Sequence, residues 1–234
     1  MESQKCIWME AGVVDYQLCP LKRNCDLCDF HKEMIRGNRS STSSSTSQTL
    51  TVRSPDISSV QFSPGLQYLE GHFWYKRVAA GRIRIGIDAI LWQLLSFTHK
   101  VIITRPGNNL HQDQCFGWIV LEGGIIYLKA PFSGKIIVTN PYFQEENIHG
   151  AQLYLTPEEE TWLLEIEETS EAKKLSLTRE QYLQQTRDDC DKYRLIQLAK
   201  RSDSEYTSPR IAPIDKHKFM TYLLSISNNR ALIC

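Results

Sequence analysis

Four cysteines fall within the first 28 residues of this 234-residue chain. Cys6, Cys19, Cys25 and Cys28 follow the spacing C-x12-C-x5-C-x2-C, and His31 lies three residues beyond the last of them. A Cys-x-x-Cys pair can place two thiolates on one ion, and two further cysteines complete a tetrahedral set. We therefore expect these four cysteines to bind a metal, with zinc as the default ion and a four-thiolate iron–sulfur cluster as the alternative.

Other interpretations of these cysteines stay open. Cys25 and Cys28 could form a redox-active pair, or all four thiols could be unligated, because their spacing is less regular than that of zinc ribbons. His31 is expected to be structural or solvent-facing, although it could replace one cysteine as a ligand. A disulfide framework is not expected, because the opening residues do not read as an export signal.

The N-terminal part of the chain has two segments of unusual composition, one rich in cysteine and one rich in serine and threonine. Residues 1–36 form a Cys-rich head that is too small to hold a stable core unaided, so a bound metal would contribute its folding free energy. Residues 38–48 read NRSSTSSSTSQ. Such a tract cannot bury enough apolar surface to offset the entropy of ordering, and we predict a flexible linker over residues 37–66.

A β-rich domain is predicted over residues 67–170. Residues 82–87 alternate polar and apolar side chains, as in a half-buried strand. Gly123 and Gly124 separate two apolar β-type runs, and a Gly-Gly pair in that place predicts a tight hairpin. Residues 88–97 have the apolar spacing of a short buried helix, and residues 171–234 are predicted to be a helical extension, with helices over 178–201 and 215–226.

Charge and residue types exclude several classes of function. The 27 basic and 27 acidic side chains cancel, so no net field favours nucleic acid or an anionic membrane. No apolar run approaches 18 residues, so we expect no membrane insertion and a cytoplasmic protein. Ser133 has no recognisable His/Asp partners, and we expect no enzyme activity.

The remaining polar candidates are interpreted as structural. The run of three glutamates at 158–160 is expected to be a solvated turn or helix start. The four histidines of the β-rich region are expected to be satisfied structural residues rather than catalysts: His72, His99, His111 and His149.

Several short motifs occur in the β-rich region in a fixed order. They are His-Phe-Trp at 72–74, Arg-Ile-Gly-Ile-Asp at 84–88, Phe-Gly and Val-Leu-Glu within 116–122, Ala-Pro-Phe-Ser-Gly-Lys-Ile at 130–136, Asn140, and Thr-Trp-Leu-Leu at 161–164. Together they resemble the glycine cleavage H-protein family, and the Cys-rich opening resembles the heads of some bacterial H-like proteins. The resemblance implies a mainly β fold with some helix, a lipoyl-domain-like sandwich of the hammerhead or flattened-barrel type.

The resemblance also implies where a lipoyl group would be attached. In the family the modified lysine lies at a hairpin tip, eight residues before the proline of the Ser-Pro or Ala-Pro turn. Counting back from Pro131 leads to Gly123, which has no side chain to modify. Lys129 lies within a predicted strand, where a lysine is usually a solvated charge that discourages edge pairing. We therefore expect no lipoate on this chain.

Three hypotheses of function follow. In the first, the chain is a non-catalytic interaction module with a metal-binding head, and it docks on a protein that recognises lipoyl-type domains or on a different protein. In the second, it is an iron–sulfur electron-transfer protein or a metal or redox sensor that uses the H-like domain as a docking platform. In the third, it remains a lipoyl carrier of glycine cleavage through another lysine.

Overall fold

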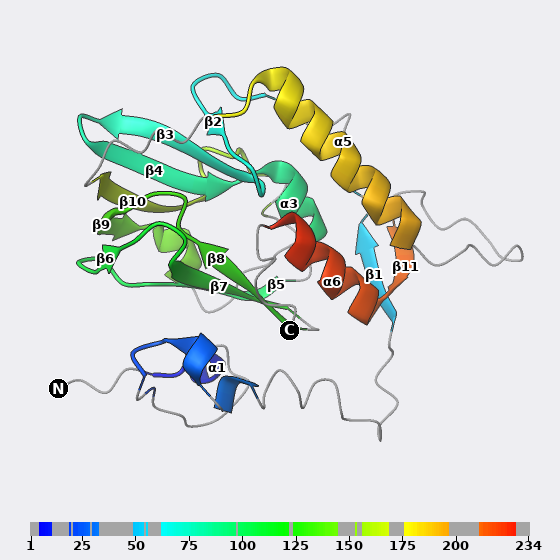
Figure 1. Cartoon of the computed structure of the whole chain (residues 1–234), viewed down its shortest axis with the longest axis horizontal. Helices are drawn as coiled ribbons and strands as arrows, with labels where there is room; N and C mark the ends of the chain where they lie inside the picture. The colour runs from blue at the N-terminus through cyan, green and yellow to red at the C-terminus, as the bar shows by residue number, and fades with distance from the viewer. Residues whose placement is uncertain are drawn as a thin grey trace, which may run out of the picture.

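The computed structural model describes residues 5–10, 19, 21–28, 30–32, 49–53, 55, 62–96, 98–121, 124–144, 153, 156–168, 176–196 and 211–227. Two antiparallel sheets of unequal size form the centre of the molecule (Figure 1). The larger has the strand order β2-β3-β4-β10-β9-β6, and the smaller has the order β5-β7-β8. The strands of the larger sheet are β2 (Gln67–Tyr68), β3 (Phe73–Ala79), β4 (Arg82–Ile87), β6 (Asn109–Leu110), β9 (Gly134–Thr139) and β10 (Trp162–Glu168). Those of the smaller sheet are β5 (Thr98–Ile103), β7 (Cys115–Leu121) and β8 (Gly124–Lys129).

Strand β4 shows how the sequence pattern builds the core. Its apolar residues Ile83, Ile85 and Ile87 are fully buried, as the alternating pattern predicts. Gly86 breaks the alternation because a Cβ atom there would lie 2.3 Å from Cζ2 of Trp74. The Trp74 indole packs over this glycine, and its Nε1 donates a hydrogen bond to the carbonyl oxygen of Ile87 at 3.0 Å.

Helices cover one side of this β domain. Asp88 is the N-cap of helix α3 (Ala89–Leu94). Its side chain accepts a hydrogen bond from the backbone N–H of Leu91. Helices α5 (Arg179–Ile196) and α6 (Lys216–Ile226) lie side by side in Figure 1. Tyr193 of α5 and Leu223 of α6 belong to the same apolar cluster as the sheets, so the predicted C-terminal helices pack on the β domain.

Part of the predicted linker is a β-strand in the structure. Strand β1 (Thr49–Arg53) lies inside the region predicted as a flexible linker, and it pairs antiparallel with β11 (Ile211–Asp215). The linker prediction is therefore wrong for these five residues, whose backbone groups are paired by a strand from the other end of the chain. Residues 37–48 of the predicted linker lie outside the described residues.

The remaining short elements are α1 (Ile7–Glu10) and η1 (Cys25–Leu27) in the head, and η3 (Pro141–Gln144) after β9. The fold class is confirmed as mainly β with a C-terminal helix pair. In the ranges described above, no helix is both long and apolar enough to cross a bilayer.

Candidate functional site

The predicted hairpin is formed by β7 and β8. Its register pairs Leu121 with Gly124 at one end and Cys115 with Lys129 at the other. Gly123, the position that the H-protein resemblance assigns to the lipoyl lysine, falls in the two-residue connection and lies outside the described residues. The sequence has no lysine between Lys100 and Lys129.

Lys129 is at the wrong end of the hairpin for a carrier residue. It lies five residues after Gly124, which is about 16 Å along an extended strand. Its side chain is half-buried rather than exposed at a turn. A group attached to Lys129 would start from the end of the hairpin opposite its turn.

The two faces of the β7–β8 hairpin contact different parts of the chain. Alternate residues point into the main core: Ile119, Leu121, Ile126 and Leu128. The residues between them form a second apolar cluster with the head, made of Trp118, Val120, Ile125 and Tyr127 together with Ile102, Cys6, Ile7, Trp8 and Cys25. Figure 1 shows the head lying against this sheet. The head predicted at the end of a flexible linker therefore buries its apolar residues on the hairpin sheet.

His31 joins the head to the hairpin. The Trp8 indole Nε1 donates to Nδ1 of His31 at 3.0 Å, and Nε2 of His31 contacts the hydroxyl of Tyr127 on β8. With Nδ1 acting as an acceptor, Nε2 carries the proton of the neutral ring. His31 is 2 % exposed, and both of its nitrogens have partners. The expectation that His31 is structural is confirmed.

The four head cysteines are described, and all of them are free thiols. Burial raises the pKa of the Cys25 thiol, and the neighbouring thiols of Cys115, Cys19, Cys6 and Cys28 raise it further. Burial also raises the pKa of Cys6, to which Cys19 and Cys28 contribute. Cys115 of β7 is thus a fifth thiol beside the head, and no local pattern could predict this because Cys115 is 87 residues from Cys28.

These thiols do not form a ligand set. Across the described ranges, no three Cys, His, Asp or Glu side chains lie close enough together to hold a metal ion. The thiols of the head are therefore neighbours without being assembled around a common centre.

The backbone after Cys19 is unusual for its residue types. The N–H of Arg23 donates to Sγ of Cys19 at 3.0 Å. Lys22 and Arg23 both have left-handed backbones, with φ of 49° and 64°. Consecutive non-glycine residues rarely adopt this conformation, and where they do, the strain often marks a functional site.

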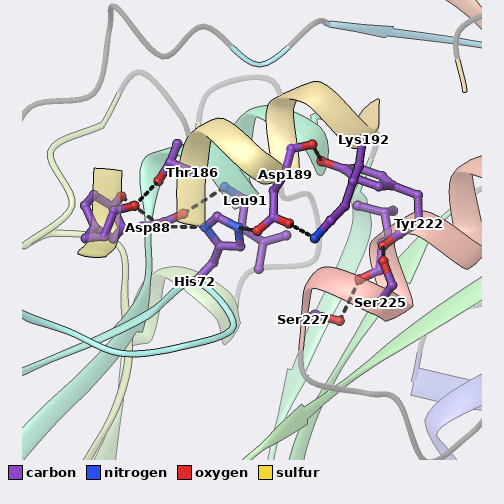
Figure 2. Close-up of polar contacts among 11 residues, drawn as sticks. His72, Asp88, Leu91, Thr186, Asp189, Lys192, Tyr222, Ser225 and Ser227 are labelled. Atoms are coloured by element: carbon purple, nitrogen blue, oxygen red, sulfur yellow. Dashed lines mark hydrogen bonds and ion pairs between the residues drawn. The ribbon is translucent and has the colours of Figure 1, made fainter. Parts of the chain in front are cut away.

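A buried polar network joins α5 to the β domain. Figure 2 shows His72 between the carboxylates of Asp88 and Asp189, with contacts of 2.7 Å from Nδ1 and 3.2 Å from Nε2. Burial lowers the pKa of His72, but the two carboxylates outweigh it and raise the pKa to about 10. Lys192 donates to Asp189 at 2.7 Å. His72 is therefore a charged structural histidine, which confirms the interpretation from sequence.

Glu158 belongs to the same region of the core. Its carboxylate accepts hydrogen bonds from the Tyr68 hydroxyl at 2.6 Å and from the N–H of Ala89 at 2.9 Å. Burial, followed by the negative charge of Asp88, raises the pKa of Glu158 to about 7. The prediction of a solvated turn is wrong for this residue, which is 8 % exposed and holds the start of α3 against β2.

Comparison with known proteins matches the part of the chain that contains the hairpin and the polar network. The family model "Glycine cleavage H-protein" matches residues 66–189. The glycine cleavage system H protein of Bacillus pumilus is 30% identical over 128 residues, which cover 53% of this chain and 95% of that protein. The one of Anoxybacillus flavithermus is 31% identical over 126 residues, with the same coverage of both chains.

A solved structure is also similar. The crystal structure of a glycine cleavage system H protein from Mycobacterium marinum has 22% sequence identity and a TM-score of 0.44, and the match covers 53% of this chain and 98% of that one. The Cys-rich head lies outside the residues that the family model matches. Because that model covers more than half of the sequence, the chain belongs to the glycine cleavage H-protein family.

Proposed function

We propose that this chain is a non-catalytic H-protein-like docking module that carries no lipoyl group. The observation that carries the proposal is the β7–β8 hairpin, which the H-protein resemblance assigns as the lipoyl hairpin and which has no lysine between its paired ends. A carrier needs a long arm on an exposed turn, and Lys129 lies at the opposite end of the hairpin. The partner is a protein that recognises lipoyl-type domains.

The head is the second part of the proposed module. It covers the outer face of the hairpin sheet through Trp8, His31 and Tyr127, so a partner that approaches the hairpin would also meet the head. We propose that Cys6, Cys19, Cys25 and Cys28 bind a metal there. The spacing of these cysteines in one small segment and the N–H directed at Cys19 support this, and thiolates suit zinc. Binding requires the thiols to draw together from their present separation.

Intact mass tests the absence of lipoate. The full chain would be produced with an enzyme that lipoylates H-proteins, beside the Bacillus pumilus H protein as the positive control. We expect the control to gain one lipoyl group and this chain to keep its unmodified mass. A lipoylated chain would overturn the proposal and support the carrier hypothesis, and peptide mapping would then identify the lysine.

Competition tests the docking role. In a glycine cleavage reaction that depends on a lipoylated H protein, an excess of this chain should lower the rate by occupying the partner. An unchanged rate at roughly tenfold excess would contradict docking on that partner.

Metal content separates the two hypotheses for the head. Protein purified without oxygen should contain one zinc per chain, and Cys25→Ser should lose it, whereas Cys190→Ser in α5 should keep it. Iron with cluster absorption in the visible spectrum would favour the electron-transfer or sensing alternative. A chain without either metal would refute metal binding by these cysteines.

A further inference from the structure

A cavity of about 630 Å³ lies between the head and strand β5. The head contributes Lys5, Met9, Glu10 and Arg23 to its lining, and residues 100–103 of β5 form another wall. Because β5 is the outermost strand of its sheet, the cavity is at a sheet edge. Its volume is within the range of small-molecule sites. Neither the hairpin nor the set of four cysteines forms part of this cavity.

Positive charge dominates the described lining. Lys5, Lys100, Arg23 and Arg105 are basic, and Glu10 is the acidic residue among those that line the cavity. Glu10 is already paired with Arg23. Within the described part of the chain, the side chains of Lys5 and Arg105 make no ion pair. A concave site with this excess of one sign attracts ligands of the opposite sign.

Arg23 is built into the structure rather than extended into solvent. Its side chain is 5% exposed, it pairs with Glu10, and its guanidinium lies 5.7 Å from the ring centre of Trp118 on β7. Among the described residues, the Nε donor of Arg23 has no hydrogen-bond partner. The ion pair and the aromatic ring fix the orientation of this buried guanidinium, and arginine suits carboxylate or phosphate groups.

Apolar side chains complete the lining. Met9 comes from the head, Val101 from β5, Pro106 from the turn after it, and Phe143 from η3. Thr139 and Asn140 also line the cavity. A ligand that fits this lining has an anionic group for the cations and a short apolar part for the remaining wall.

We propose that this cavity binds a small organic anion, one with a carboxylate or phosphate group on a short apolar chain. The site includes head residues, so binding would hold the head against β5 and stabilise its packing. The proposal does not depend on the absence of lipoate or on metal binding, because neither strand β7 or β8 nor the four head cysteines contribute to the lining that the structure describes.

Calorimetric titration of the full chain tests the proposal with three probes. Hexanoate carries the anionic group and the apolar chain, inorganic phosphate carries the anionic group alone, and hexylammonium carries the same chain with the opposite charge. We expect hexanoate to bind with a dissociation constant below about 1 mM and hexylammonium not to bind. Binding of phosphate alone would support the anion site and assign phosphate as its head group.

Variants locate the binding. Lys5→Ala with Arg105→Ala should weaken binding at least about tenfold, since both exposed cations are lost. Arg187→Ala, an exposed arginine of α5, is the matched control and should bind as the wild type does. The proposal is overturned if neither anion binds at about 10 mM, if hexylammonium binds equally well, or if the double variant binds unchanged.

Discussion

Two buried polar residues show how far side-chain roles can be inferred from sequence. His72 was expected to be structural, and it is, because a histidine without catalytic neighbours in the sequence usually satisfies buried partners. Glu158 was expected to be solvated because it begins a run of three glutamates, yet Glu158 alone of them is buried. Its partners Tyr68 and Ala89 come from distant parts of the chain, so no local pattern could reveal them.

Replacing His72 should be costly. His72→Leu leaves the carboxylates of Asp88 and Asp189 in the core without the cation between them, and we expect a loss of about 3–5 kcal/mol in the free energy of unfolding. Because its pKa is raised from 6.5 to about 10, the stabilisation is full below pH 6.5 and fades as the pH rises towards 10. Urea denaturation from pH 6 to 10 measures both effects.

The exposed His111 provides the control for that substitution. His111→Leu should change the free energy of unfolding by less than about 0.5 kcal/mol. A His72→Leu protein that is as stable as the control, or whose deficit does not narrow with rising pH, would contradict a charged His72.

Titration of Glu158 also lowers the stability of the protein as the pH rises, over a lower pH range than titration of His72. Its pKa is raised from 4.5 to about 7, so the folded state binds the proton more tightly and stability falls as the pH rises from 4.5 to 7. Glu158→Gln removes the charge and should be more stable than the wild type at pH 8 by up to about 3 kcal/mol, with little difference at pH 4.5. Denaturation at the two pH values measures this, and an advantage for the wild type at pH 8 would refute the raised pKa.

Individual elements were more predictable from sequence than the way they pair. The strands 82–87 and 116–121 and the helix at 215–226 occur close to their expected positions, since each has its own pattern of apolar residues. The pairing of β1 with β11 joins segments without such a pattern, and the sequence did not predict it. The apolar runs of β7 and β8 are continuous rather than alternating, which is typical of strands buried on both faces and could have predicted a covering element.

The covering element is the head, and Trp8 should be its main anchor. Trp8 is 3 % exposed and packs with Trp118 and Ile125 on the hairpin sheet. Trp8→Ala should weaken the packing of the head by about 3–5 kcal/mol, while the main core of the β domain stays folded. Hydrogen exchange should then increase in residues 5–10 and in β8 but not in α5.

Leu27→Ala is the matched control within the head, because Leu27 is 66 % exposed and contributes little buried surface. It should exchange as the wild type does. If Trp8→Ala leaves exchange in the head and β8 unchanged, then Trp8 does not anchor the head to the hairpin sheet.

At the scale of the whole molecule, experiment can test whether the family fold supports lipoylation once a lysine is present at position 123. The matched region contains the hairpin, and in the proposed function the residue at position 123 decides whether the hairpin can be modified. Gly123→Lys, produced with an enzyme that lipoylates H-proteins, should gain one lipoyl group by intact mass. Asn108→Lys, which places a lysine in the exposed turn between β5 and β6, should remain unmodified.

The head packs on the sheet that contains the hairpin, so the same experiment also tests whether the head blocks access of the enzyme. If the enzyme reaches the hairpin freely, Gly123→Lys will be modified to the same extent with and without Trp8→Ala. If the head shields the hairpin, the modified fraction will rise when Trp8→Ala releases it. A Gly123→Lys chain that stays unmodified in both backgrounds would show that a lysine at position 123 is not enough to make the β7–β8 hairpin a carrier site. The surface that the hairpin offers to such an enzyme would then differ from that of the H protein used as the positive control.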